Sequence, residues 1–447
     1  MNIVIIGNGI AGITAARHIR KKSNHSITVV SGESEYFYSR PALMYVYMGH
    51  LKFEHTQPYE NWFWKKNRID IVQDYALRVN HAEKKVHLQS GNVLGYDKLI
   101  LATGSQTNKF GWKGQDLTGV QGLYSKQDLD LMERNTRSVS RAIVVGGGLI
   151  GIEVAEMLHS RNIPVTMLVR ESGYWNNVLP AEESAMINRH IRHQGIDLRL
   201  ETELKEIISD SSGRVSSVIT SKGDEIPAQF VALTAGVHPN IDLALQSSIP
   251  AKRGILVNPY LETQINDVYA IGDCAEISTL DGGRSQVEQL WYTGEMHGET
   301  IAETICGERT EYNRGILFNS AKFFDIEYHT YGQVNLNTAG EKSLFWEHPD
   351  HRRSIRIVYN NLQVIGFNNL GVRYRHKTCE QWIAEKRSIE YVLEHLSEAN
   401  FDPEFFKRFE TEIITLYNNK NERTLTIGKE RGLFGYKKFL SSVPSSL

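Results

Sequence analysis

Cysteine is scarce in this chain of 447 residues. Its three cysteines, Cys274, Cys306 and Cys379, lie far apart, and no two of them form a C-x-x-C pair. This spacing argues against a disulfide framework and against a cysteine-based zinc centre, and we expect no metal site. It suits a reducing compartment, so we expect a cytoplasmic protein.

Long apolar runs and an excess of either charge are also missing. No apolar stretch is long enough to span a bilayer, and the formal net charge is only −2. We therefore expect neither a membrane nor a nucleic acid as a partner. The first predicted strand is under way by Ile3, so we expect no signal peptide ahead of the fold. A chain of this length should hold two or three domains.

What the sequence does contain is a pair of glycine-rich turns, 139 residues apart. Each follows a short apolar stretch predicted to be a strand, residues 3–6 and 142–145, and each opens a helical pattern. Both therefore predict the first βα turn of a dinucleotide-binding unit, where glycines permit a tight bend and a close approach of the pyrophosphate to the helix N-terminus. The positions predicted to contact a dinucleotide are Gly7, Gly9, Ala11 and Gly12 in the first unit and Gly146, Gly148, Leu149, Ile150 and Gly151 in the second.

Two such units in one chain predict two bound dinucleotides. FAD paired with NADH or NADPH is the combination we expect, with hydride transfer between them. In the first unit Glu33 lies 21 residues after Gly12, near the spacing of a carboxylate that binds a ribose hydroxyl, and Glu35 is the alternative. In the second unit Glu171 favours the ribose hydroxyl of NADH, whereas Arg170 beside it would suit the 2′-phosphate of NADPH. The residues leave this choice open, with a slight preference for NADH.

Three further motifs occur in a fixed order, the first of them between the two glycine turns and the other two after the second turn. Apolar segments end at Ala102, Thr103 and Gly104, then at Ala235 and Gly236, then at Gly272 and Asp273. With these motifs, residues 1–275 resemble the FAD-dependent pyridine nucleotide-disulfide oxidoreductase family. The resemblance implies an α/β fold with two Rossmann-like dinucleotide-binding domains, as in glutathione reductase, and a C-terminal α+β domain. It implies an FAD domain of residues 1–115 and 250–325, an NAD(P)H domain of 116–249, and a domain of 326–447 for dimerisation or acceptor docking that ends in a tail from about Asn418.

The resemblance also implies roles for residues around the flavin. Asp273 would accept hydrogen bonds from the ribitol hydroxyls, or serve as a helix N-cap, or both, and the backbone at Gly272 would face the pyrophosphate. Gln289 and Leu290 precede a helix whose N-terminus would point at the flavin. Trp291 is either a residue beside the isoalloxazine ring or a core tryptophan, and the sequence leaves both open.

One absence separates this chain from the relatives that use a thiol. Those relatives carry a redox cysteine just past the second strand of the first unit, but residues 36–45 contain none. This argues against a flavin-adjacent dithiol, a CoA-disulfide site or a peroxide-reducing sulfenate. The segment instead resembles the Tyr-x-Arg-Pro-x-Leu stretch of rubredoxin reductases, ferredoxin reductases and the flavin domain of NAD(P)H nitrite reductases. Arg40 and Pro41 in it are expected to contact the flavin cofactor.

The chain departs from that branch at one position. Relatives often carry a lysine where Tyr45 stands here, paired with a glutamate that matches Glu153 near the flavin N5. Arg40 or a more distant lysine could replace that partner, a tyrosine could hydrogen-bond Glu153, or Glu153 could be only a first-turn carboxylate favoured by the helix dipole. We take Glu153, Tyr45 and Arg40 as the candidate catalytic residues.

These features predict an NAD(P)H oxidoreductase that passes electrons through FAD to a one-electron carrier protein, or to a partner redox subunit, without a redox disulfide. The alternatives are a redox-regulated binding module like apoptosis-inducing factor and a flavoprotein subunit of a larger electron-transfer complex. Homodimers are frequent among such relatives, so a homodimer stays open.

The C-terminal third is predicted to contain strands and a docking surface. Strands are expected at residues 345–346, 355–359 and 362–367, with a hairpin turn at Asn360-Asn361, and a helical pattern ends near Leu396. Another helix should begin at Asp402. Acidic carriers would dock on basic clusters, although solvated charge without a partner is the alternative. These clusters comprise Arg352, Arg353 and Arg356; Arg373, Arg375, His376 and Lys377; and Arg423, Lys429, Arg431, Lys437 and Lys438.

Overall fold

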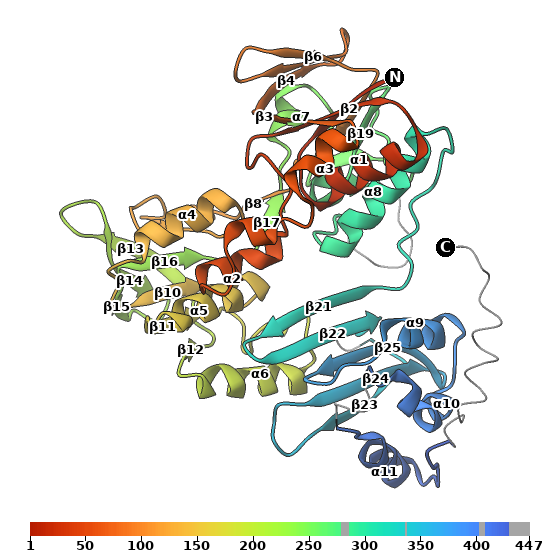
Figure 1. Ribbon diagram of the computed structural model, residues 1–447. Helices are drawn as coiled ribbons and strands as arrows, with labels where there is room; N and C mark the ends of the chain where they lie inside the picture. The colour runs from red at the N-terminus through yellow and green to blue at the C-terminus, as the bar shows by residue number, and fades with distance from the viewer. Residues whose placement is uncertain (279–285, 336–337, 402–406, 429–447) are drawn as a thin grey trace. The chain divides into compact units, whose positions relative to one another are not determined.

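A computed structural model describes residues 1–278, 286–335, 338–401 and 407–428. The described chain forms two compact units (Figure 1). The first holds residues 1–176 and 187–314, and the second holds residues 177–186 and the chain from 315 onward. The predicted helix start at Asp402 and the basic residues from Lys429 onward lie outside the described residues.

Two parallel five-stranded sheets form the centre of the first unit. The first sheet has the order β19 (Val268–Ala270), β7 (Lys98–Leu101), β1 (Asn2–Ile6), β2 (Ser26–Ser31) and β3 (Ile69–Gln73). The second has the order β12 (Asp197–Arg199), β11 (Val165–Leu168), β10 (Ala142–Val145), β16 (Phe230–Leu233) and β9 (Val120–Gln121). Most strand residues are buried, as expected for parallel sheets covered on both faces. The predicted α/β class is confirmed.

Each glycine turn lies where a central strand passes into a helix. Strand β1 leads into α1 (Ile10–Lys22), and β10 leads into α5 (Leu149–Ser160). Since the neighbouring strands run parallel, their carboxyl ends meet at one edge of each sheet, beside these helix N-termini. This places the predicted phosphate-binding turns at the sheet edge where α/β proteins bind ligands.

Smaller elements complete the first unit. Strands β8 (Ser105–Thr107) and β17 (Val237–Pro239) form an antiparallel pair. In the sequence, each of these two strands stands where the chain passes from one five-stranded sheet to the other. The helices are α2 (Leu43–Tyr47), α3 (Asn61–Lys66), α4 (Lys126–Asn135), α7 (Asp242–Gln246) and α8 (Trp291–Ile305), and two 3₁₀ turns are η1 (Arg40–Ala42) and η3 (Gly272–Cys274). The remaining strands are β4 (Ala76–Asn80), β5 (Lys85–Leu88), β6 (Val93–Gly95), β13 (Leu204–Ser209), β14 (Val215–Thr220), β15 (Glu225–Pro227), β18 (Ile255–Val257) and β20 (Ala275–Ile277).

Helices α1 and α8 pack closely together on the first sheet (Figure 1). Replacing Gly298 of α8 by alanine should separate them, because an added Cβ would lie 2.6 Å from the Ala11 carbonyl oxygen and 2.7 Å from Thr14 Cβ. We expect the free energy of unfolding to fall by about 1–3 kcal/mol, the usual cost of overpacking. Gly95→Ala is the control, because a Cβ there meets nothing within 4 Å. Equal denaturation midpoints for the two variants would contradict this expectation.

The second unit is built on an antiparallel five-stranded sheet with helices on one face. The strand order is β21 (Phe318–Phe323), β22 (Ile326–Gly332), β25 (Gln363–Leu370), β24 (Ser354–Asn360) and β23 (Glu341–Glu347). Helices α9 (His376–Ala384), α10 (Ile389–Glu394) and α11 (Glu410–Asn421) share its core, and η4 (Leu396–Ala399) follows α10. Strand β21 lies before residue 326, and residues 177–186 also belong to this unit, so its limits differ from the predicted 326–447.

Two local predictions in this unit were wrong. The hairpin turn is Asn361-Leu362 rather than Asn360-Asn361, because Asn360 pairs with Gln363 and both turn residues have positive φ, 47° and 67°. The single helical pattern is in fact two helices. The chain breaks at Lys386, which has a φ of 53°, and Ser388 then caps α10 by accepting a hydrogen bond from the Tyr391 amide at 3.1 Å.

Candidate functional site

A cavity of about 940 Å³ lies in the first unit. This volume is near the upper end of the range of about 300–1,000 Å³ for small-molecule sites. Its wall contains most of the predicted site residues, which come from segments far apart in the chain. These are Gly7, Gly9, Ala11, Glu33, Arg40, Pro41, Ala102, Thr103, Gly104, Leu149, Ile150, Glu153, Gly272, Asp273, Gln289, Leu290 and Trp291.

The first glycine turn has the shape of a phosphate cradle. Gly7 has a φ of 112°, and a Cβ there would lie 2.1 Å from the Ala102 carbonyl oxygen, so only glycine fits. Gly12 is equally confined, since its Cβ would meet the Gly7 carbonyl oxygen at 2.1 Å. At Gly9, by contrast, a Cβ would meet nothing within 4 Å, and no side chain caps the helix that Gly9 begins. The open space and uncapped N–H groups fit a pyrophosphate.

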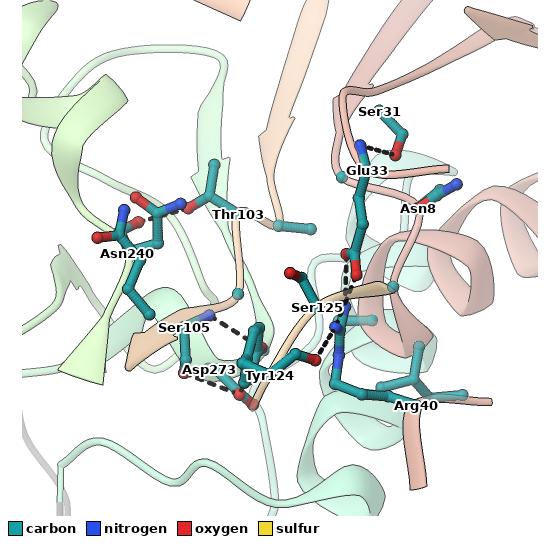
Figure 2. A pocket seen from close by; sticks show the side chains of 18 of the residues that line it. Asn8, Ser31, Glu33, Arg40, Thr103, Ser105, Tyr124, Ser125, Asn240 and Asp273 are labelled. Carbon is teal, nitrogen blue, oxygen red and sulfur yellow. Dashed lines mark hydrogen bonds and ion pairs between the residues drawn. The ribbon is translucent and has the colours of Figure 1, made fainter. Parts of the chain in front are cut away.

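Glu33 and Arg40 form an ion pair at the cavity wall (Figure 2). Arg40 Nη1 and Nη2 donate to Glu33 Oε1 and Oε2 at 2.9 and 2.8 Å, and the Lys126 amide donates to Oε1 at 2.9 Å. Tyr38 also donates to Oε1. Burial favours the neutral carboxyl, but the Arg40 charge and these hydrogen bonds outweigh it and lower the pKa of Glu33. Glu33 therefore offers a ligand mainly its second oxygen, Oε2.

Asp273 lies across the cavity in a second polar network (Figure 2). Ser105 Oγ and Tyr124 Oη donate to Asp273 Oδ2 at 2.9 and 3.3 Å, and Gln289 Nε2 donates to Ser105 Oγ at 2.7 Å. Burial raises the pKa of Asp273, and the two hydroxyl hydrogen bonds and the Arg40 charge oppose that rise. This carboxylate therefore depends on its hydrogen bonds to stay ionised.

Sequence reasoning missed Ser105 and Tyr124. Tyr124 directly precedes α4, whose N-terminus is fixed by a capping box of Ser125 and Asp128. That S-x-x-D pattern is visible in the sequence and marks a residue held at a helix entry. Nothing in the sequence, however, shows that this helix entry lies against the Glu33–Arg40 pair and Asp273.

His297 of α8 supports the η3 turn from behind. Its Nδ1 accepts a hydrogen bond from the Gly272 amide at 3.0 Å, and its ring packs edge-on against Tyr312. Burial, with a smaller contribution from the Arg314 charge, lowers the pKa of His297 to about 3. The imidazole is therefore neutral at physiological pH and remains a permanent acceptor for the turn that carries Asp273.

The second glycine turn brings helix α5 to the same cavity, where Leu149, Ile150 and Glu153 line the wall. Gly146 has a φ of 128°, and a Cβ there would meet the Thr234 carbonyl oxygen at 2.6 Å. Gly151 is confined by the Gly146 carbonyl oxygen at 2.6 Å, whereas a Cβ on Gly148 would meet nothing within 4 Å. No side chain caps α5, so this turn also fits a pyrophosphate.

The other predicted residues are placed as follows. Tyr45 is not among the residues that line the cavity, and its ring stacks on His50 at 6.1 Å. Trp291 lines the cavity and also packs against the core of the first unit.

Four other predicted nicotinamide residues, Arg170, Glu171, Ala235 and Gly236, are not among the described residues that line the cavity. Arg170 and Glu171 form an ion pair with each other at 2.8 Å, which leaves the choice between NADH and NADPH a prediction. The Ala235 carbonyl accepts a hydrogen bond from Asn108 at 3.2 Å, and Gly236 has a φ of 89°.

No thiol lines the cavity within the described residues, since no cysteine is among those in its wall. The cysteine next to Asp273, Cys274, is fully buried, and its thiol bonds the Ile271 carbonyl oxygen at 3.3 Å. Burial raises the pKa of Cys274, which keeps the thiol protonated and unreactive.

The predicted basic clusters of the second unit are largely neutralised. Arg356 is buried and bonds the carboxylates of Glu182 and Glu183 at 2.6–2.8 Å, so its inclusion in an exposed docking cluster was wrong. Other ion pairs of these clusters join Arg352 to Asp325, Arg353 to Asp350, Arg373 to Glu327 and Arg423 to Glu390, and His376 Nε2 lies 4.0 Å from Glu380 Oε2. Arg375 and Lys377 are exposed.

Within the described ranges, every helix is too short or too polar to cross a membrane.

Known proteins resemble the chain in sequence and in fold. The family model described as "Pyridine nucleotide-disulphide oxidoreductase" matches residues 1–298. Nitrite reductase [NAD(P)H] of Bacillus subtilis is 28% identical over 369 residues, which are 81% of this chain but only 45% of that protein. The chain thus spans less than half the length of this relative. Rubredoxin-NAD(+) reductase of Pseudomonas putida is 28% identical over 69% of this chain and 81% of its own length.

Among solved structures, the reductase in the covalent putidaredoxin reductase–putidaredoxin complex matches with a TM-score of 0.78. The match covers 93% of this chain and 98% of that one at 21% identity, and at this identity it shows the fold alone. The predicted fold, two Rossmann-like domains followed by a C-terminal α+β domain, is confirmed.

Proposed function

The chain belongs to the pyridine nucleotide-disulphide oxidoreductase family, and we propose that it passes electrons from NAD(P)H through FAD to a one-electron carrier protein or a partner redox subunit. The observation that carries this proposal is that a single cavity is lined both by the first glycine turn and by helix α5, which follows the second glycine turn. Two dinucleotides bound at these turns would meet there. FAD, when bound, accepts a hydride from NAD(P)H and releases electrons singly, so no thiol is required.

Different residues of the cavity wall would bind different parts of FAD. Gly9 and the N-terminus of α1 would hold the pyrophosphate, Glu33 Oε2 would accept from a ribose hydroxyl, and Asp273 would accept from ribitol. The N-terminus of α8, at Leu290, directs the positive end of a helix dipole at the cavity and would favour negative charge on the reduced flavin. Residues 1–115 and 250–314 would form the FAD-binding part, and 116–249, apart from 177–186, the NAD(P)H-binding part.

Glu153 is the candidate carboxylate for the transfer site, because it lines the cavity from helix α5. Arg40 is a poor substitute for the missing lysine partner, since both of its terminal nitrogens are engaged by Glu33. We propose that Arg40 holds the cofactor-binding wall together and that Tyr45, on α2, acts on the site only indirectly.

The electron acceptor is proposed from the relatives. One is named for rubredoxin, one structure holds putidaredoxin, and one is a nitrite reductase more than twice as long as the matched region. A small carrier and a partner redox subunit are therefore both candidate acceptors. The three free cysteines suit the proposed cytoplasmic location.

Replacing Gly9 by alanine should abolish FAD binding without unfolding the protein. Gly9 has a φ of −70° and an open space at its Cβ position, so alanine fits the empty turn but occupies the space proposed for the pyrophosphate. We expect FAD content after purification to fall at least about tenfold, the equivalent of about 1.4 kcal/mol. Gly95→Ala serves again as the control. Full FAD content in the Gly9→Ala variant, with unchanged circular dichroism, would contradict the proposed pyrophosphate site.

The function itself is tested by offering the holoprotein two kinds of acceptor under anaerobic conditions with NADH or NADPH. We expect reduction of one-electron acceptors such as a rubredoxin, a ferredoxin or ferricyanide, and no reduction of glutathione disulfide or CoA disulfide. Reduction of a disulfide alone would overturn the proposal. Cys306→Ser, which changes the most accessible of the three cysteines, should leave the rates unchanged.

A further inference from the structure

We propose that Tyr124 is a positioning residue of the flavin site, which holds the Asp273 carboxylate with its hydroxyl and the Arg40 guanidinium with its ring. Tyr124 comes from the segment between β9 and α4, outside every motif that predicted the cofactor sites. The inference rests on the proposed function, because it assigns Asp273 to FAD.

The hydroxyl of Tyr124 is fixed from two sides. It donates to Asp273 Oδ2 at 3.3 Å and accepts from the Ser105 amide at 3.0 Å. Ser105 Oγ donates to the same Oδ2 at 2.9 Å. Within the described part of the chain, Asp273 Oδ1 receives no hydrogen bond. The protein thus hydrogen-bonds Oδ2 of Asp273 and leaves Oδ1 for a ligand.

The ring of Tyr124 fixes the opposite wall. The Arg40 guanidinium carbon lies 4.3 Å from the ring centroid, and Arg40 Nη1 donates to the Tyr124 carbonyl oxygen at 2.6 Å. Gly104 completes the arrangement, because its φ is 72° and a Cβ there would lie 2.9 Å from the Tyr124 hydroxyl. One side chain therefore joins the Thr-Gly turn, the Glu33–Arg40 pair and the Asp273 turn (Figure 2).

The consequence for Asp273 is electrostatic. The titratable or charged groups that face it are Arg40 from η1 and Tyr124, and the neutral His297 lies behind its turn on α8. Hydrogen bonds to a carboxylate favour its ionised form, whereas burial disfavours it. Without the Tyr124 hydroxyl, Asp273 should become protonated at a higher pH, and a protonated carboxyl accepts poorly from ribitol.

The experiment measures the release of FAD from the holoprotein as a function of pH, through the fluorescence of free FAD. Tyr124→Phe removes the hydroxyl and keeps the ring over Arg40, and Ser105→Ala removes the other donor to Asp273 Oδ2. We expect each variant to raise the midpoint pH of release by about one unit, the equivalent of one charge-assisted hydrogen bond. Tyr260→Phe is the matched control, because Tyr260 stacks under Arg309 away from the cavity, and its midpoint should equal that of the wild type.

Each outcome is decisive. A midpoint in Tyr124→Phe that equals the wild-type value would overturn the positioning role of Tyr124, whatever the midpoint of Ser105→Ala. If either variant fails to fold, the other still carries the test. FAD that is bound but not reduced by NADH or NADPH in the wild type would overturn the proposed function while leaving the positioning role intact, so the two failures are distinguishable.

Discussion

Replacing Arg356 by alanine should lower the free energy of unfolding of the second unit by about 3–5 kcal/mol. Its side chain is 7% exposed, and its Nε and Nη2 donate to Oε1 and Oε2 of Glu183 at 2.6 and 2.7 Å. The Glu183 side chain is fully buried. Alanine would leave that carboxylate without its cation inside the protein, and the cost of a buried, unpaired charge greatly exceeds the net stabilisation from the intact pair.

Urea denaturation, followed through the fluorescence of Trp346 and Trp382 in the second unit, measures this effect. Arg375→Ala is the matched control, because Arg375 is exposed. Arg356→Met combined with Glu183→Met should recover most of the loss, since a buried ion pair can be replaced by apolar groups at little cost. A change below about 1 kcal/mol in Arg356→Ala, the value of a surface ion pair, would show that the pair is solvated.

Acid should destabilise the first unit through His297. Its pKa is about 3 in the folded protein, against about 6.5 in an unfolded chain. Between these values the unfolded state binds more protons, so this contribution to stability is complete above pH 6.5 and is lost as the pH falls toward 3. From pH 7 to pH 5 the loss should be about 2 kcal/mol, at about 1.4 kcal/mol for each pH unit below 6.5.

The control for His297 is the glutamine variant. Glutamine keeps an acceptor for the Gly272 amide but cannot take up a proton near neutral pH. The difference in unfolding free energy between pH 7 and pH 5 should therefore be smaller in His297→Gln than in the wild type by about 2 kcal/mol. Equal pH dependence in the two proteins would mean that His297 is not the group responsible.

Local sequence patterns were sufficient for the parts of the fold that depend on near neighbours. The glycine spacing predicted both turns because Gly7 and Gly146 need left-handed φ values. The periodicity of the C-terminal third predicted strands and a helical pattern, but not the position of the hairpin turn or the break between the two helices. The differences lie at two places, the turn that follows Asn360, which pairs with Gln363, and the break at Lys386, which has a positive φ. These choices depend on register and on tertiary packing, which a single sequence does not display.

Contacts between distant segments were beyond sequence reasoning. Arg356 belongs to an arginine-rich run that predicts a solvated surface, yet it bonds Glu183, which is 173 residues away in the chain. Tyr124 has no motif, but it lies 149 residues from Asp273 in sequence and within hydrogen-bonding distance in the fold. In both cases a buried carboxylate is stabilised by a partner that lies far from it in the sequence, so the pairing cannot be predicted from near neighbours.

The most direct test of the proposed function is anaerobic stopped-flow absorbance of the FAD-loaded protein at the flavin band, with NADH and NADPH mixed in separately. We predict bleaching faster than about 1 per second with at least one of them, within the usual range of enzymes. If Arg170→Ala slows bleaching by NADPH alone, the arginine selects the phosphate, and if Glu171→Ala slows bleaching by NADH alone, the carboxylate selects the ribose. No bleaching with either nucleotide would contradict the proposal that two dinucleotides meet in this cavity.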